Sequence, residues 1–332
     1  MALALAAGFH RAGVVDPRLL SGWPAEASRA AADAPSASDL EWDWVRSPLR
    51  WSASFTILVC CLSCLRSEPD DPGSPGDPRG LVAPFARAHY YRQAVRMLRG
   101  VVGRLEQEQG VPSAGVRLFS NSRLPEKPLL VATGLAAYGR NGCAIVPGLG
   151  SLFVIAGAVL PLPTRLSAPA APLPQPCGSC RACQAACPVG ALGRPYVVDR
   201  DRCLQAVATS PREMSEGVMD AWGVRLYGCQ SCQSVCPHNR GLSCTAPPAV
   251  GEVGAGIPLL SFLSEDAPAR AARFRGSALG MSWVPAEALV RNALVAAGNR
   301  GDICARSAVE AWLRNEHSPL IATAARWARA RL

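Results

Sequence analysis

The chain has 332 residues, of which 49% are apolar and 18% are charged, and its formal net charge is +9 at pH 7. This composition excludes a disordered chain and allows two or three domains with full hydrophobic cores. The positive charge indicates an anionic partner such as RNA. The alternative is a solvated surface, because nearly all of the basic residues are arginines and Lys127 is the single lysine.

We expect residues 1–165 to form one α/β domain. Residues 1–9 are apolar, but basic residues follow without a small-residue cleavage pattern, so no secretory signal is expected. An Ala-, Ser- and Pro-rich stretch at 25–38 precedes a β-like run at 55–60. Residues 67–80 are dense in Pro, Gly and Asp, which predicts a loop.

Apolar residues recur at helical spacing over residues 81–109, which predicts a long amphipathic helix. Short strands and Gly-rich turns are expected from 111 to 163. Residues 143–163 carry no charge and are long enough to span a bilayer, but Pro and Gly interrupt them early. We therefore expect buried strands there, with a core strand near 152–160, and no membrane span.

A Pro-rich connector leads into a cysteine-rich module over residues 166–248, and a helical domain follows over residues 249–332. Residues 286–297 and 303–313 predict a helical hairpin, and residues 319–332 predict a final helix. Two stacked hairpins would resemble a short HEAT-like repeat. The predicted class is therefore an α+β multidomain protein.

The cysteines bunch into CxxC spacings, which in a chain of this length indicates metal ligation in a reducing compartment and predicts a cytoplasmic protein. The run C-x2-C-x2-C-x3-C-P begins at Cys177 and is typical of bacterial ferredoxins, in which the fourth cysteine ligates the other cluster. A second run, C-x2-C-x3-C-P, begins at Cys229, and Cys203 supplies the thiolate that it lacks. We assign Cys177, Cys180, Cys183 and Cys236 to a first [4Fe–4S] cluster, and Cys187, Cys203, Cys229 and Cys232 to a second.

Two all-cysteine zinc sites are the alternative, because soft thiolates also bind zinc. The Cys-Pro endings and the three-cysteine run favour cubanes. The other six cysteines lie in apolar or isolated settings and are given no role. They are Cys60, Cys61, Cys64, Cys143, Cys244 and Cys304.

The cluster module resembles that of the cobalamin-dependent epoxyqueuosine reductases, through CGSC at 177–180, CPVGAL at 187–192 and GCQSCQSVCP at 228–237. VRNALVAAGN at 290–299 is similar to the family's RNAL-and-GN signature. The resemblance implies the last step of queuosine formation in tRNA, with electrons passing from a donor such as flavodoxin or ferredoxin through two [4Fe–4S] clusters to cobalamin. It also implies a nitroreductase-like α/β cobalamin domain, HEAT-like helices that help to hold tRNA, and a monomer that needs no membrane.

Upstream, residues 134–151 resemble the segment with which these enzymes hold cobalamin. Asn121 stands where the family has a carboxylate, and the helix that usually carries Asp-Tyr-His has other residues at 90–92. An amide cannot deliver a proton as a carboxylic acid can, so another group or another reaction is implied. Glu126, Lys127 and Tyr138 could substitute as the proton donor, and together with Asn121 they are the candidate catalytic residues. The resemblance gives Gly139, Arg140, Asn141 and Ser151 as candidate cofactor-binding residues.

Three functions stay open from the sequence. The first is reduction of epoxyqueuosine in tRNA. The second is a diverged corrinoid and iron–sulfur reductase of another substrate, which Asn121 favours. The third is a two-cluster electron-transfer protein whose first domain is a docking surface. Binding of tRNA would separate the first two, and binding of a corrinoid would separate both from the third.

Overall fold

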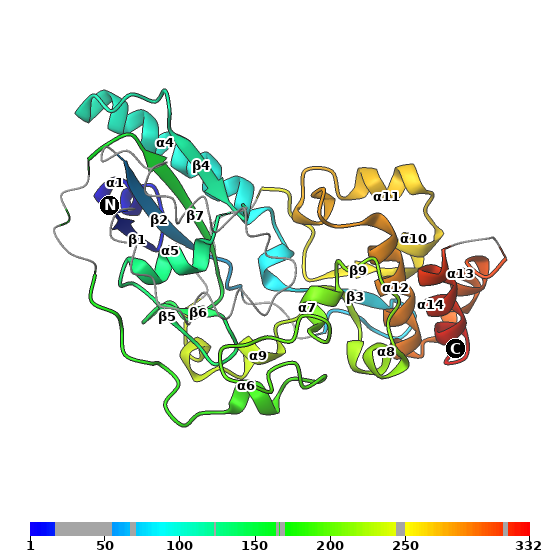
Figure 1. Ribbon diagram of the computed structural model, residues 1–332. Coiled ribbons are helices and arrows are strands. Elements are labelled where there is room, and N and C mark those ends of the chain that lie inside the picture. The colour runs from blue at the N-terminus through cyan, green and yellow to red at the C-terminus, as the bar shows by residue number, and fades with distance from the viewer. Residues whose placement is uncertain are drawn as a thin grey trace.

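The structure is a computed structural model that describes residues 1–16, 55–66, 71–122, 124–163, 166, 170–243, 250–314 and 318–332. The predicted stretch at 25–38 and Cys244 lie outside these residues. Helix and sheet are both present, as the predicted α+β class requires, and a large sheet-based part is followed by a helical part (Figure 1).

A four-stranded antiparallel sheet with the order β1-β2-β7-β4 organises the N-terminal half. The two central strands pair over their full length, from Thr56 opposite Leu160 to Ser63 opposite Phe153. The strand predictions at 55–60 and 152–160 are therefore confirmed, and the uncharged stretch forms sheet core. The strands are β1 (Arg11–Val15), β2 (Thr56–Ser63), β4 (Arg117–Ser120) and β7 (Phe153–Leu160).

Every residue of β2 is buried because helices cover both faces of the sheet. Leu58 and Cys60 pack into one core with residues of α1 and α4, whereas Ile57 and Val59 pack into a second core with residues of α5. None of the helices in the described part of the chain is long and apolar enough to cross a membrane. The covering helices are α1 (Ala2–Ala6), α4 (Tyr90–Gln109) and α5 (Glu126–Ala132).

Two details of the predicted elements are wrong. The long helix α4 begins at Tyr90 and not near residue 81, because Arg79–Val82 forms strand β3 and Pro84 opens a 3-10 turn. The Nδ1 atom of His89 caps α4 by accepting a hydrogen bond from the Arg92 amide at 3.3 Å. The segment 111–163 also contains a helix, α5, in addition to strands and turns.

A second, three-stranded sheet has the order β8-β3-β9. Strand β3 runs parallel to β8 (Arg225–Tyr227) and antiparallel to β9 (Gly256–Pro258). One strand comes from each of the three segments that the sequence divides into domains. The segments are therefore joined by backbone hydrogen bonds, and the domain boundaries at 165 and 248 stay a prediction.

The C-terminal helices confirm the predicted helices near 286–297 and 319–332, whereas strand β9 shows that this part of the chain is not helical throughout. Helix α12 (Ala286–Arg300) is buried along most of its length and packs against α14 (Pro319–Arg329). The shorter helix α13 (Arg306–Ala311), which lies between them in the sequence, also packs against α14. Together with β8 and β9 they enclose the largest hydrophobic core of the chain.

The RNAL-like signature on α12 points inward. Arg291 and Asn292 have no exposed surface. The Arg291 guanidinium donates hydrogen bonds of 2.6 to 2.7 Å to three backbone carbonyls, and the Asn292 amide donates to two more. Desolvation lowers the pKa of Arg291 to about 10, so the side chain stays charged at neutral pH. The signature thus fixes α12 to the loop that precedes the second cysteine run. The acceptors are the carbonyls of Val207, Ala208, Ser210, Arg212 and Leu226.

We expect Arg291→Ala to lower the free energy of unfolding by about 3 kcal/mol, because it leaves buried carbonyls without donors. Urea unfolding of the full chain measures the effect. Arg104→Ala is the matched control, since Arg104 forms an exposed ion pair with Glu108 and its loss should change stability by less than about 0.5 kcal/mol. Equal, small changes in the two variants would contradict the assigned role of Arg291.

Candidate functional site

Four cysteines surround a cavity of about 240 Å³. They are the four assigned to the first cluster, and the sulfur of Cys236, which is far along the chain, lies close to those of Cys177 and Cys180. The short helix α6 (Ala182–Ala185) carries Cys183, and Pro237 begins a 3-10 turn directly after Cys236. The ring consists of Cys177, Cys180, Cys183 and Cys236.

Arg140 supplies donors to this first cavity. Its backbone amide donates to Cys177 Sγ at 3.3 Å, and its Nη2 donates to the Gly178 carbonyl at 2.6 Å. Its Nε is buried and has no hydrogen-bond partner among the described residues. A cationic donor of this kind fits an anionic iron–sulfur cluster, whose sulfurs accept hydrogen bonds.

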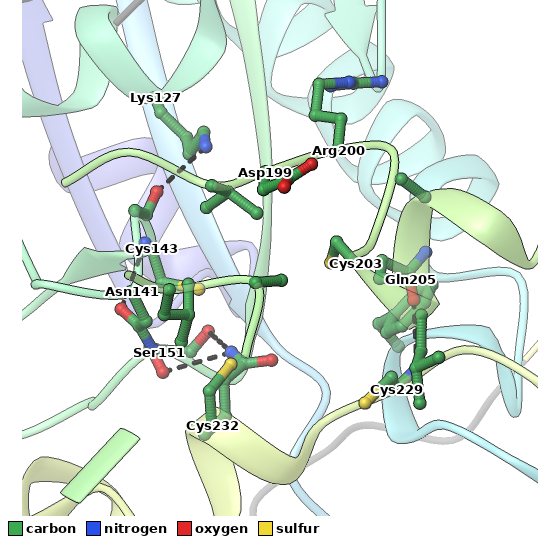
Figure 2. Close-up of a pocket in the computed structure, with 18 of the residues that line it drawn as sticks. Lys127, Asn141, Cys143, Ser151, Asp199, Arg200, Cys203, Gln205, Cys229 and Cys232 are labelled. Carbon is green, nitrogen blue, oxygen red and sulfur yellow. Dashed lines mark hydrogen bonds between the residues drawn. The ribbon is translucent and has the colours of Figure 1, made fainter. Parts of the chain in front are cut away.

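The other four assigned cysteines line a much larger cavity of about 2290 Å³, here called the chamber. Figure 2 shows Cys203 and Cys229 on one side of the chamber and Cys232 on the other side. The Cys203 amide donates to the Asp199 carbonyl at 2.9 Å, and the Cys229 amide donates to Gln205 Oε1 at 3.1 Å. The bond between Cys229 and Gln205 holds the second cysteine run beside Cys203. The set consists of Cys187, Cys203, Cys229 and Cys232.

The donor chemistry of both sets fits a cubane cluster. All eight cysteines are free thiols, and each set of four lines one cavity. Thiols spread around a cavity are what a [4Fe–4S] cluster needs, since its irons, and not one central ion, bind them.

All four candidate catalytic residues line the chamber. Asn121 is exposed and has a positive φ of 50°, which Asn tolerates better than most residues. The exposed Lys127 donates from Nζ to the Gly142 carbonyl at 3.0 Å. Tyr138 ends the short strand β5 (Ala137–Tyr138), and burial raises the pKa of its phenol.

Glu126 is the one carboxylic acid among these residues, and it lies in the first turn of α5. Its Oε1 accepts hydrogen bonds from the Ser122 amide at 2.7 Å and the Ser122 hydroxyl at 3.0 Å. Burial raises the pKa of Glu126 to about 7 against the opposing effect of these bonds. The structure therefore places an acid that is half protonated at neutral pH in the same chamber as the second cluster's cysteines.

Comparison with known proteins agrees with a double-cluster module in this part of the chain. Residues 176–239 match the family model of the 4Fe-4S double cluster binding domain. The chain is 28% identical over 256 residues to the epoxyqueuosine reductase of Staphylococcus aureus, 31% over 163 residues to that of Escherichia coli K12, and 31% over 236 residues to that of Burkholderia pseudomallei. These alignments cover 76%, 48% and 67% of this chain and 66%, 42% and 56% of the relatives, so the chain spans less than two thirds of their length.

Solved structures share the whole fold. A selenomethionine-labelled epoxyqueuosine reductase superposes with a TM-score of 0.85 at 22% identity, covering 99% of this chain and 88% of the other. The enzyme from Bacillus subtilis gives a TM-score of 0.83 at 23% identity, with the same coverage. The chain is a relative of the epoxyqueuosine reductases. The double-cluster module and the mixed helix and sheet architecture predicted from the sequence are confirmed.

The segment that resembles the reductases' cobalamin-binding stretch is divided between the two cavities. Asn141 and Ser151 line the chamber, and Arg140 and Asn141 line the cavity of the first cluster. Gly139 begins the turn that carries Arg140 and Asn141, and its carbonyl accepts a hydrogen bond from the Gly142 amide at 2.9 Å. The Ser151 hydroxyl accepts hydrogen bonds from Gln233 at 3.1 Å and Asn239 at 3.0 Å. The segment therefore also docks on the cluster module, and its cofactor contacts stay a prediction.

The sequence analysis gave Cys143 no role, but the structure places it at the site. It lines the chamber, as does Cys232, a ligand assigned to the second cluster (Figure 2). Cys143 lies inside the stretch at 134–151 but is not among the residues that carry its resemblance to the reductases. Spacing alone could not show that a cysteine 89 residues before Cys232 would line the same chamber.

Proposed function

We propose that this chain reduces epoxyqueuosine in tRNA, using two [4Fe–4S] clusters and cobalamin. The observation that carries the proposal is the chamber itself, because the second cluster's cysteines and the Glu126 acid line one continuous cavity. An electron source and a proton source therefore meet where a substrate can enter. The relatives named above are epoxyqueuosine reductases, and this supports the proposal.

The chamber has room for a corrinoid. Its volume of about 2290 Å³ is well above the roughly 300–1,000 Å³ of ordinary small-molecule sites. Asn141 and Ser151 would hold the cofactor through their amide and hydroxyl groups, with Tyr138 as a packing surface. Bound cobalamin would supply the two-electron chemistry at the substrate.

Conversion of an epoxide to an alkene consumes two electrons and two protons and releases water. Glu126 would donate a proton to the epoxide oxygen as its carbon–oxygen bond breaks, taking the place of the acid that Asn121 replaces. Lys127 would orient the substrate beside it, since its Nζ is fixed by the Gly142 carbonyl.

Arginines at the chamber fit a tRNA backbone. Arg194, Arg200 and Arg202 are exposed and line it, and guanidinium groups pair well with phosphates. A structural relative was solved with a tRNA-Tyr epoxyqueuosine-modified stem loop, which supports this placement. We further propose a cytoplasmic monomer, fed by flavodoxin or ferredoxin, with a nitroreductase-like cobalamin domain at 1–165, a cluster domain at 166–248 and HEAT-like helices at 249–332.

The test uses the full chain, reconstituted anaerobically with iron, sulfide and cobalamin. We expect about eight irons and one corrinoid per chain, and formation of queuosine when epoxyqueuosine-modified tRNA and a reductant are added. Mass spectrometry of the digested tRNA measures the product. Chain loaded with clusters but without cobalamin is the control. A fully loaded protein that leaves the modified tRNA unchanged would refute the substrate.

Asn121 favours a second candidate, a reductase with the same cofactors and another substrate. If this second candidate is correct, the protein reconstituted with iron and sulfide should bind corrinoid but should not bind the modified stem loop. Filter binding of the stem loop, measured at two salt concentrations, separates the two candidates, because phosphate contacts weaken as salt rises.

A further inference from the structure

Arg140 is fixed against the turn that carries the first ligand of the first cluster. Its backbone amide donates to Cys177 Sγ at 3.3 Å, and its carbonyl accepts a hydrogen bond from the Tyr196 amide at 2.9 Å. Its Nη2 atom donates to the Gly178 carbonyl at 2.6 Å. Both the backbone and the guanidinium of Arg140 are therefore held by the cluster module, although Arg140 precedes Cys177 by 37 residues.

One donor of the Arg140 guanidinium, the Nε–H group, is buried and has no hydrogen-bond partner among the described residues. Leaving a buried N–H without an acceptor costs free energy, so an unused donor of this kind indicates an acceptor that the polypeptide itself does not supply. Arg140 lines the cavity that the four cysteines of the first set surround. The sulfurs of a [4Fe–4S] cluster bound there would accept this hydrogen bond.

The charge of Arg140 distinguishes it from the other residues around this cavity. Among the described residues that line it, Arg140 is the only arginine, lysine or carboxylate side chain. His238 is the one other side chain there that can carry a positive charge, and its Nε2 is hydrogen-bonded to the Pro176 carbonyl at 2.8 Å. An arginine in a protein is always protonated. Arg140 thus places a permanent positive charge beside the cysteines of the first cluster.

We propose that the positive charge of Arg140 raises the reduction potential of the first cluster. Reduction adds one electron to a cluster that is already anionic, so a fixed positive charge nearby stabilises the reduced state more than the oxidised state. Hydrogen bonds to cluster sulfur act in the same direction. The electron enters without a proton because the guanidinium is protonated before and after the transfer, so Arg140 changes the potential and not the stoichiometry.

The effect of Arg140 is largest at the first cluster. Arg140 lines the cavity of that cluster and is not among the residues that line the chamber. Coulomb interactions weaken with distance and are screened by salt, so the charge acts less on the second cluster. An external donor can then reduce the first cluster more easily. This inference rests on the two-cluster part of the proposed function and requires neither cobalamin nor tRNA.

The experiment is a redox titration of the reconstituted full chain with dithionite, followed by electron paramagnetic resonance. In Arg140→Met, which keeps an unbranched side chain but removes the charge, we expect one cluster signal to shift to a more negative midpoint potential. The same shift should appear when Arg140→Met is combined with Cys203→Ala, because that chain lacks a ligand of the second cluster and keeps those of the first. Arg140→Lys keeps the charge and should shift the signal less. Arg104→Met, which breaks an exposed ion pair with Glu108, is the matched control and should shift neither signal.

Unchanged potentials in Arg140→Met would overturn the proposal. A shift in Arg140→Lys as large as that in Arg140→Met would also overturn it, because lysine keeps the charge. Loss of about four irons in Arg140→Met would overturn it too, since Arg140 would then serve to hold the cluster and not to set its potential. A chain that shows the expected shift but leaves the modified tRNA unchanged would support this inference and refute the substrate alone.

Discussion

Cys203→Ala should retain about four irons in place of about eight and should lose reductase activity completely. Cys203 is the second-cluster ligand that lies outside both CxxC runs, and it reaches the chamber at the start of α7 (Leu204–Val207). Its sulfur lies near those of Cys229 and Cys232. Without it the second cubane lacks its fourth thiolate, whereas the first cluster keeps all of its ligands.

Iron and sulfide analysis, combined with electron paramagnetic resonance, measures this result. One cluster signal should disappear and the other should keep its midpoint potential. Cys60→Ala removes a cysteine buried in the core of the sheet and should retain all irons. Two intact clusters in Cys203→Ala would show that the ligand assignment is wrong.

The double-cluster module could be predicted because ligation imposes fixed spacing on the sequence. The first run places three thiolates in one short segment, and both runs end in Cys-Pro, as in bacterial ferredoxins. The central strands of the large sheet were also predictable, since β2 and β7 are buried on both faces and therefore read as continuous apolar runs.

Features that depend on tertiary contacts were not predictable. The start of α4 was misplaced because the apolar residues of β3 fit the helical period although they pair with β8 and β9. Cys143 reaches the chamber, and Arg140 reaches Cys177, only through the fold. Arg291 is charged, and charged residues usually lie at the surface, yet it is buried in the core. Backbone carbonyls from another segment accept its hydrogen bonds there.

Glu126→Gln should lower kcat by about 100-fold, because it removes a general acid. Burial places the pKa of Glu126 at about 7, so the acid is protonated below that pH and ionised above it. The rate of the natural chain should therefore be constant at low pH and should fall about tenfold for each pH unit above 7. In Glu126→Gln the remaining rate should not show this fall.

The neighbours of Glu126 do not provide the same pH dependence. Tyr91 interacts with it, but burial raises the pKa of that phenol, which therefore stays neutral across this range. Lys127 is exposed and hydrogen-bonded to the Gly142 carbonyl, so Lys127→Arg is the matched control that keeps the charge. It should retain the fall in rate above pH 7.

Asn121→Asp in the Glu126→Gln background completes the test of the proton donor. The substitution would place a carboxylic acid at the position where the resemblance to the reductases implies one, and Asn121 lines the same chamber as Glu126. Partial recovery of kcat would show that the reaction needs one acid in this chamber and that Glu126 normally supplies it. If Glu126→Gln alone keeps both the rate and its pH dependence, the proton comes from elsewhere, and Glu126 serves to hold the loop through Ser122.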